Sequence, residues 1–217
     1  MSNPIQAVIW DLDGVILASA DEHRRAWQRL AREEGIPMTD ADFWATFGKR
    51  NDDIFASLWG ILPPEQVKDL SNRKELYFRE LIQESAVPLP GAIELMRELH
   101  ESRFAQALAS STPVENINLI ADVLGLKRYL SILVSGETVA KGKPAPDIFL
   151  KAAAELHMHP TVCLVIEDAV AGVEAAHAAA MRCIAVTGNR DLPGLGKAEL
   201  TVNDLTEVDV KRIQQLA

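Results

Sequence analysis

The sequence predicts an α/β protein in which a parallel sheet carries helices on both faces and an all-helical unit is inserted after the first strand. Three observations predict this class. Residues 5–10 form an almost continuous apolar run, typical of a strand that is buried on both sides. Between residues 15 and 87 the apolar periodicity is helical, with no strand pattern. From residue 92 onward helix and strand patterns alternate, which favours βαβ units and a Rossmann-like parallel sheet.

The inserted unit divides into helical segments with recognisable start and stop signals. In the first segment Trp27, Leu30 and Ala31 fall on one face of a helix, and Gly35 provides a stop. The last segment begins at a Pro-Pro pair, and proline is favoured in the first helical turn. The predicted helices of this unit are residues 20–34, 40–46, 51–59 and 65–84.

The second part of the chain begins after the turn sequence PLPG at residues 88–91. The predicted helices are residues 92–101, 113–124, 147–156 and 169–179, and the predicted strands are 104–109, 132–134, 162–166, 183–186 and 200–202. This organisation predicts two domains. Residues 1–16 and 88–217 would form the α/β core, and residues 17–87 a helical cap domain.

Composition narrows the class of protein. The 217 residues are 48% hydrophobic and 24% charged, which is ordinary for a soluble globular protein. The net charge of −9 argues against a nucleic-acid partner, which needs a basic surface. No apolar run has the roughly 20 residues of a membrane span, and no signal peptide is evident, so we expect a cytoplasmic protein, a monomer or weak dimer. Cys163 and Cys183 lie in apolar runs and are expected to be core thiols.

The first strand runs directly into two carboxylates, Asp11 and Asp13, followed by Gly14. Two like charges at the end of a buried strand raise each other's pKa, and a divalent cation such as Mg²⁺ resolves the conflict. With the metal bound, one carboxylate can attack an electrophile while the second moves a proton. Gly14 lets the chain turn sharply and keeps side-chain bulk away from the site.

The ligands of a parallel sheet bind beyond the carboxyl ends of its strands, so the residues after the other strands are the next candidates. Ser110 and Ser111 follow the second strand, and Thr112 with Glu115 predicts a capping box whose helix N-terminus suits an anion. The two serines are equally consistent with ordinary turn residues. Lys143 belongs to a proline-rich, rigid approach to the next helix, which suits neutralisation of phosphate charge; a solvated lysine is the alternative.

Two further acids, Glu167 and Asp168, follow the fourth strand. Acids at a helix N-terminus are favoured by the helix dipole, which explains one of them but not a pair after so apolar a strand. Gly172, four residues further on, would allow close helix packing.

These stretches together resemble the haloacid dehalogenase superfamily of phosphohydrolases and phosphomutases. DLDGV at residue 11 looks like the first motif, Ser110 stands at the position of the second, GKPAPDIF resembles the third and VIEDAVAGVEAA the fourth. The resemblance covers nearly the whole chain, and each motif follows the strand that should carry it. The nearest subgroup looks like the β-phosphoglucomutase and phosphoglycolate phosphatase-like branch, whose small helical cap corresponds to the inserted unit.

The resemblance implies a role for each motif residue. Asp11 would be the nucleophile that forms an aspartyl-phosphate, and Asp13 the general acid and base. Ser110, Ser111 and Lys143 would hold the phosphoryl oxygens.

The family also implies the metal site. Mg²⁺ would be held by Asp11, the backbone carbonyl of Asp13 and Asp168, with Glu167 in supporting contact.

Several cap residues are candidates for substrate contact. His23 stands where the mutases carry a histidine, and either a substrate-proximal or hinge role or a plain surface position fits. Gly48 begins a stretch resembling the specificity loop of the cap. The mutases place an arginine three residues later to hold a distal phosphate, but here that residue is Asn51 and Arg50 comes one position early. Lys74 could contact substrate or lie on a solvated helix face.

Two enzymatic functions and one non-enzymatic function follow from these motifs. The first is a Mg²⁺-dependent phosphatase that acts on a small-molecule phosphate ester, such as a sugar phosphate. The second is a phosphosugar mutase of the β-phosphoglucomutase type, which the missing arginine disfavours. The third is a catalytically inactive binding module, which the chemically intact motifs disfavour.

Overall fold

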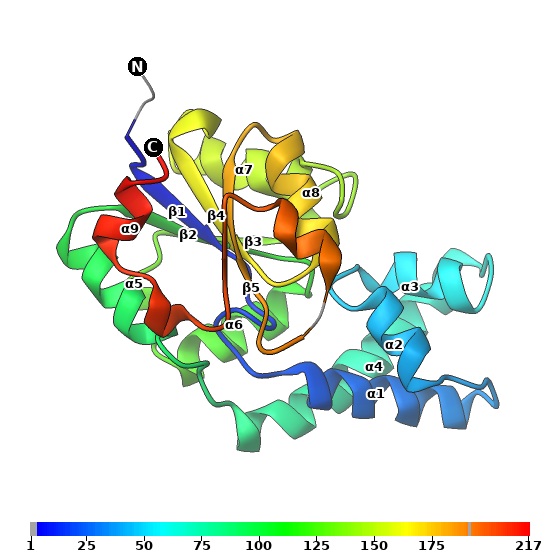
Figure 1. The fold of residues 1–217 in the computed structure, drawn as a ribbon. Coiled ribbons are helices and arrows are strands. Elements are labelled where there is room, and N and C mark those ends of the chain that lie inside the picture. The colour runs from blue at the N-terminus through cyan, green and yellow to red at the C-terminus, as the bar shows by residue number, and fades with distance from the viewer. Residues whose placement is uncertain (1–3, 191) are drawn as a thin grey trace.

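A computed structural model describes residues 4–190 and 192–217, so residues 1–3 and residue 191 of the predicted core lie outside it. Within these residues six parallel strands form one sheet in the order β3-β2-β1-β4-β5-β6, and the predicted α/β class is confirmed (Figure 1). The strands are β1 Ala7–Trp10, β2 Ala105–Ser110, β3 Ile132–Ser135, β4 Cys163–Glu167, β5 Arg182–Val186 and β6 Leu200–Val202. The motif-bearing strand β1 is therefore central, between β2 and β4.

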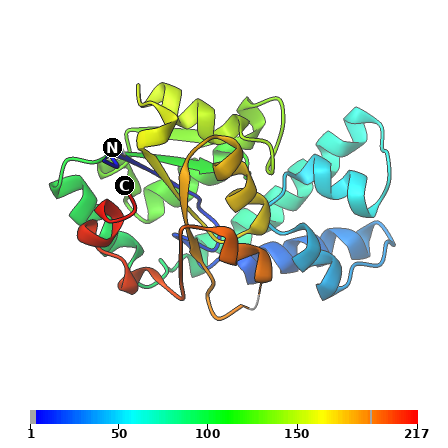
Figure 2. The same cartoon turned by 45° about the horizontal axis from the view of Figure 1, so that its top comes forward.

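Helices cover both faces of this sheet (Figures 1 and 2). One face carries α5 Ala92–Glu101, α6 Val114–Val123 and α9 Val210–Gln214, and the other carries α7 Asp147–Glu155 and α8 Val170–Ala178. Because side chains alternate along a strand, Val8 and Trp10 of β1 join the first core, while Ala7 and Ile9 join the second. Both faces of β1 are thus buried, as its unbroken apolar sequence predicts.

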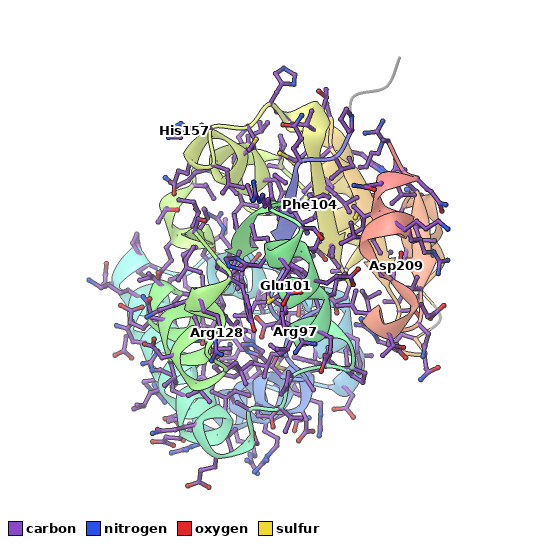
Figure 3. All side chains as sticks on the ribbon, turned by 90° about the vertical axis from the view of Figure 1, so that its left-hand side faces the viewer. Arg97, Glu101, Phe104, Arg128, His157 and Asp209 are labelled. Carbon is purple, nitrogen blue, oxygen red and sulfur yellow. The ribbon has the colours of Figure 1, made fainter. Side chains whose placement is uncertain are left out.

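The outer surface on the α5 side carries several charged side chains. Figure 3 shows Arg97, Glu101 and Arg128 on this side, and all three are exposed. The two cysteines, by contrast, are buried free thiols, as expected, and burial raises the pKa of Cys163 to about 11. In the described part of the chain, no helix has the length and apolar character required to cross a bilayer.

The inserted segment forms four helices beyond the carboxyl end of β1, where the blue and cyan ribbons lie in Figure 1. These are α1 Ala20–Glu33, α2 Asp40–Thr46, α3 Asn51–Leu58 and α4 Pro64–Ser85. Helices α1 and α4 pack side by side. Leu17 pairs with Asp13 and with Pro88, so the two connections to the sheet run next to each other. This pairing lies at the boundary that the sequence predicts between core and cap; the division into two domains stays a prediction.

One sequence-based expectation is wrong, and one helix was not anticipated. The capping box at Thr112 and Glu115 is wrong, because Pro113 is extended (φ −58°, ψ 153°) and α6 begins only at Val114 without a side-chain cap. The first helical N–H, that of Val114, instead donates to the Glu137 carboxylate at 3.1 Å. The short helix α9 was not predicted, since its five residues are too few for a clear helical periodicity.

Candidate active site

Three carboxylates from two neighbouring strands meet at the rim of the sheet. Asp11 follows β1, Glu167 ends β4 and Asp168 follows it, and the two strands pair with Trp10 opposite Ile166. The three groups offer oxygens that all lie within 4.8 Å of one another. All three side chains are buried, with 6%, 1% and 1% exposure for Asp11, Glu167 and Asp168. Parallel pairing therefore brings together acids that lie more than 150 residues apart in the chain.

A single lysine joins two of these acids. Nζ of Lys143 donates to Oδ1 of Asp11 at 2.6 Å and to Oε1 of Glu167 at 2.5 Å. The other oxygen of Glu167 accepts from the backbone N–H groups of Asp168 (2.7 Å) and Ala169 (2.8 Å). Lys141, two residues earlier, is exposed. Of the two lysines at positions 141 and 143, Lys143 is thus the one that lies in the site, and it belongs to the GKPAPDIF stretch.

The cluster carries more negative charge than its cations balance. Burial raises the pKa of Asp11 well above its usual value, Lys143 opposes this, and the charges of Glu167 and Asp168 add to it. Burial and the charge of Glu167 likewise raise the pKa of Asp168 to about 7, although Arg190 opposes the shift. For Lys143, burial lowers the pKa, but the adjacent Asp11 and Glu167 outweigh this and keep the ammonium charged.

Arg190 was not predicted as a site residue. Its Nη2 donates to Oδ2 of Asp168 at 2.6 Å and to the backbone carbonyl of Asp168 at 3.2 Å. It follows β5, so the search for polar residues after each strand would have found it if extended to the fifth strand.

Two glycines leave room for the cluster. Gly14 has φ +82°, and a Cβ there would collide with the carboxylate of Asp168. A Cβ on Gly172 would collide with the carboxylate of Glu167. The sequence predicted that Gly172 allows close helix packing; in the structure it also leaves space for the Glu167 side chain. Both positions require glycine because a buried carboxylate occupies the space.

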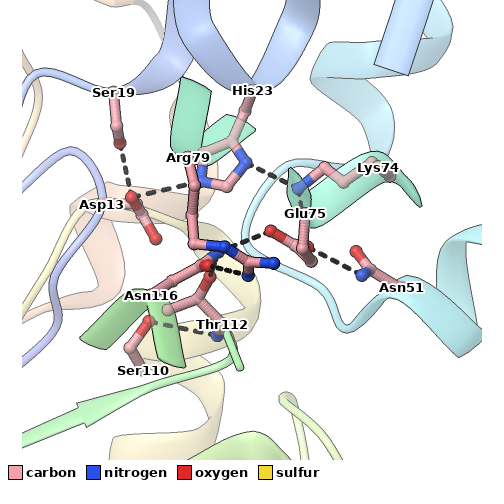
Figure 4. A network of polar contacts seen from close by, with 10 residues as sticks. All are labelled: Asp13, Ser19, His23, Asn51, Lys74, Glu75, Arg79, Ser110, Thr112 and Asn116. Atoms are coloured by element: carbon pink, nitrogen blue, oxygen red, sulfur yellow. Dashed lines mark hydrogen bonds and ion pairs between the residues drawn. The ribbon is translucent and has the colours of Figure 1, made fainter. Parts of the chain in front are cut away.

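Asp13 belongs to a second polar group, which reaches into the cap (Figure 4). Its Oδ1 accepts from Ser19 Oγ at 2.5 Å and lies 3.3 Å from Nε2 of His23. Nζ of Lys74 lies 2.7 Å from Nδ1 of His23. An ammonium can only donate, so Nδ1 accepts and Nε2 carries the proton that it donates to Asp13. Burial raises the pKa of Asp13, but His23 and Ser19 outweigh it and the net shift is downward.

These contacts decide two alternatives that the sequence left open. His23 is 7% exposed and stacks on Phe78 at 3.8 Å, so the surface alternative is wrong. Lys74 is 2% exposed, so the solvated alternative is wrong as well.

Glu75 is the main cap residue that sequence reasoning missed. Its Oε1 accepts from Lys74 (2.9 Å) and Asn51 (2.7 Å), and its Oε2 accepts from Asn116 of α6 at 2.5 Å. Arg79 donates to the other end of the Asn116 amide at 2.8 Å, so α4 is joined to α6 twice (Figure 4). Only its neighbour gave a sequence signal, since Lys74 falls four residues from both Leu70 and Phe78 and therefore lies on the apolar face of α4.

The loop after β2 lines the same cavity as the two aspartates. Ser110, Ser111 and Thr112 border a narrow space of ≈ 40 Å³ together with Asp11 and Asp13. Oγ of Ser110 accepts from the backbone N–H of Thr112 at 3.2 Å.

The predicted specificity loop closes this cavity from the cap side. Gly48 and Asn51 line it, and a Cβ on Gly48 would come to 3.1 Å from that of Ala169. Arg50 points elsewhere: its guanidinium lies 3.2 Å from Asp53 and 3.4 Å from Asp52. The arginine of this loop is therefore already paired with acids.

Fold and site together define an α/β protein whose buried carboxylates and lysine gather after the first and fourth strands of a parallel sheet. The model of the haloacid dehalogenase-like hydrolase family matches residues 5–180. The chain belongs to this family.

Individual proteins agree with this assignment. The chain is 30% identical over 203 residues to validoxylamine A 7'-phosphate phosphatase of Streptomyces hygroscopicus subsp. limoneus, covering 94% of this chain and 95% of that one. It is 33% identical over 211 residues to β-phosphoglucomutase of Bacillus subtilis, covering 93% and 92%. The crystal structure of β-phosphoglucomutase from Clostridium difficile superposes with a TM-score of 0.87 at 27% identity, covering 98% and 96%. The predicted subgroup is thereby confirmed.

Proposed function

We propose that this protein is a Mg²⁺-dependent phosphatase of small phosphorylated metabolites, sugar phosphates or similar compounds, and thus a phosphoric monoester hydrolase. The observation that carries the proposal is the buried cluster of Asp11, Glu167 and Asp168 with Lys143 among them. Family membership and the phosphatase among the relatives support it.

The donor set fits a magnesium ion. Carboxylate oxygens are the hard ligands that Mg²⁺ prefers, and the raised pKa values of Asp11 and Asp168 reflect negative charge that a cation would balance. We propose that Asp11, Asp168 and the backbone carbonyl of Asp13 hold the ion, with Glu167 in support. When bound, Mg²⁺ would neutralise charge on a phosphoryl oxygen.

The proposed reaction has two steps. In the first, a carboxylate oxygen of Asp11 forms a bond to phosphorus, the bond from phosphorus to the ester oxygen breaks, and protonated Asp13 gives its proton to that leaving oxygen. In the second, water attacks the aspartyl-phosphate, Asp13 takes the water proton, and phosphate leaves with Asp11 restored. The lowered pKa of Asp13 keeps it ionised in the free protein, so it would take up the proton for the first step from solvent when the phosphate ester binds. Once that proton has gone to the leaving oxygen, the ionised carboxylate suits the second step.

The remaining residues position the group that is transferred. Lys143, Ser110 and Ser111 would hold the phosphoryl oxygens, and Lys143 already lies 2.6 Å from the nucleophile. Phosphoryl transfer depends mostly on positioning and charge neutralisation, so this small set is sufficient.

A panel of phosphate esters that includes p-nitrophenyl phosphate tests this function. We expect hydrolysis with Mg²⁺ and its loss with EDTA, measured as released phosphate. A metal-replete protein that hydrolyses no member of the panel would support the inactive binding module.

The mutase alternative predicts a different product. With glucose 1-phosphate and a bisphosphate primer, a mutase forms glucose 6-phosphate, whereas a phosphatase releases phosphate. Arg50 is paired with Asp52 and Asp53, and Asn51 cannot supply the missing charge. We therefore expect released phosphate to be the main product. Released phosphate and glucose 6-phosphate are measured in parallel, the latter in a coupled assay, and dominant formation of glucose 6-phosphate would favour the mutase.

The effect of Mg²⁺ on stability should grow with pH. The pKa of Asp168 is raised from 3.8 to about 7, so its contribution to the stability of the metal-free fold is complete below about pH 4 and is lost as the pH rises through 7. Metal binding needs ionised ligands and therefore strengthens over the same range. We expect Mg²⁺ to raise Tm by a few degrees at about pH 8 and by much less at about pH 5.5.

Thermal melts with Mg²⁺ or EDTA at both pH values measure this difference. The variant Asp168→Asn should lose most of the Mg²⁺ effect at the higher pH. An equal Mg²⁺ effect at both pH values would contradict the role of this carboxyl.

A further inference from the structure

Glu75 stands between two cavities. The narrow cavity at Asp11 and Asp13 (≈ 40 Å³) and a wider one (≈ 580 Å³) between the cap and the start of α6 share Asn51, Glu75 and Ser111. Because these three residues border both cavities, a substrate whose phosphoryl group binds at Asp11 and whose far end reaches the wider cavity passes beside Glu75. The charge and hydrogen bonds of Glu75 therefore affect how well the part of the substrate beyond the phosphoryl group binds.

The carboxylate of Glu75 is a fixed negative charge. The side chain is 3% exposed, and Lys74, Asn51 and Asn116 all donate to its oxygens at 2.5–2.9 Å. Burial raises its pKa, but the charge of Lys74 and the hydrogen bonds from Lys74 and Asn51 outweigh burial and the net shift is downward. The group is ionised at neutral pH and cannot easily move aside.

The charged groups around this junction are unbalanced. Lys74 contacts Glu75 and His23, and Arg50 contacts two aspartates. Arg79 donates to the neutral amide of Asn116 and keeps its charge, and the exposed Lys68 also borders the wider cavity. The wall of that cavity carries four acids, Asp52, Glu75, Glu115 and Glu137, against three cations, Arg50, Lys68 and Arg79. An added anion beside Glu75 would meet a fixed carboxylate in a wall with an excess of negative charge.

We propose that Glu75 is a specificity-determining residue that restricts the substrate to monophosphates with an uncharged, hydroxyl-rich remainder and rejects a second phosphate. The inference rests on the proposed function, because it takes the phosphoryl group to bind at Asp11. A substrate hydroxyl can donate to Glu75 in place of an asparagine amide, so an uncharged sugar or polyol keeps the carboxylate hydrogen-bonded. A second phosphate placed beside it meets like charge in a buried, weakly screened setting.

A binding experiment without turnover tests this selectivity. The variant Asp11→Asn, with Mg²⁺, is titrated by calorimetry with fructose 1-phosphate and with fructose 1,6-bisphosphate, which differ by one phosphate. We expect the monophosphate to bind about tenfold more tightly or better. Adding Glu75→Gln, which keeps the size and removes the charge, should reduce this preference by about tenfold, mainly by tightening the bisphosphate.

A matched variant separates charge from the contact between cap and core. Asn116→Ala removes both hydrogen bonds between α4 and α6 and leaves the charges of Glu75 and Arg79 in place, so the preference should persist. Glu75→Asn serves as a second neutral variant if Glu75→Gln unfolds, as judged by a thermal melt. The inference is overturned if the neutral variants keep the preference, if Asn116→Ala loses it equally, or if neither sugar phosphate binds. Absence of p-nitrophenyl phosphate hydrolysis by the wild type contradicts the proposed function instead, and the binding ratio still decides the role of Glu75.

Discussion

Asp11→Asn should lose nearly all hydrolysis of phosphate esters, by a factor on the order of 10⁴ or more, as expected for removal of a nucleophile. The amide is close in size to the carboxylate but cannot form the acyl phosphate. Lys143 keeps its second partner, Glu167, at 2.5 Å, so the side chains around position 11 remain connected. Released phosphate in the presence of Mg²⁺ is the measurement.

An exposed aspartate provides the control for this variant. Asp122→Asn on α6 removes the same charge at a position whose side chain is 64% exposed and pairs with Lys127. Its activity should equal that of the wild type, and both variants should melt cooperatively. Hydrolysis by Asp11→Asn at even a tenth of the wild-type rate would exclude Asp11 as the nucleophile.

Gly172→Ala should lower both the free energy of unfolding and the activity, whereas replacing glycine by alanine within a helix usually stabilises a protein. In an ordinary helix interior, alanine is favoured over glycine by about 1 kcal/mol. Here the added Cβ would collide with the carboxylate of Glu167, which Lys143 and two backbone N–H groups hold in place. We expect a net loss of about 1–3 kcal/mol in the free energy of unfolding, as for an overpacked core.

The same collision should also lower the rate of phosphate-ester hydrolysis. Because Lys143 bridges Glu167 and Asp11, displacement of Glu167 moves the lysine that would hold the phosphoryl group. A misplacement of about 1 Å can lower the rate by about 10²-fold.

Urea unfolding and kcat/KM with Mg²⁺ measure the two effects. Gly196→Ala is the control, since a Cβ there meets nothing within 4 Å and should change little. A Gly172→Ala protein that is more stable than the wild type and fully active would contradict this explanation.

Local patterns in the sequence were sufficient for most of the fold. Strand β1 was predictable because it is apolar throughout, and α2 is found within the predicted bounds because its residues follow helical periodicity. The start of α6 was misplaced because Pro113 and Thr112 are compatible with either of two helix starts, and the side chain of Glu137, 23 residues away, contributes to the one adopted.

The candidate site was predictable to the extent that it follows from sheet topology. Residues that follow parallel strands converge on one edge, so Asp11, Glu167 and Asp168 could be grouped before their distances were known. Arg190 follows the same rule and was overlooked. The position of Lys74 between Leu70 and Phe78 indicated burial, but its contact with His23 was not predictable, because that contact depends on which helix packs against α4.

Short-range periodicity and the order of strands were enough to predict the α/β class, the inserted helices and the set of acids and lysine that we propose carry the chemistry. The tertiary structure decided which charges compensate one another: Lys143 between Asp11 and Glu167, His23 between Asp13 and Lys74, and Glu75 beside Asn116. These pairs join residues from separate elements, and their interaction depends on distance and burial, which no spacing along the chain specifies.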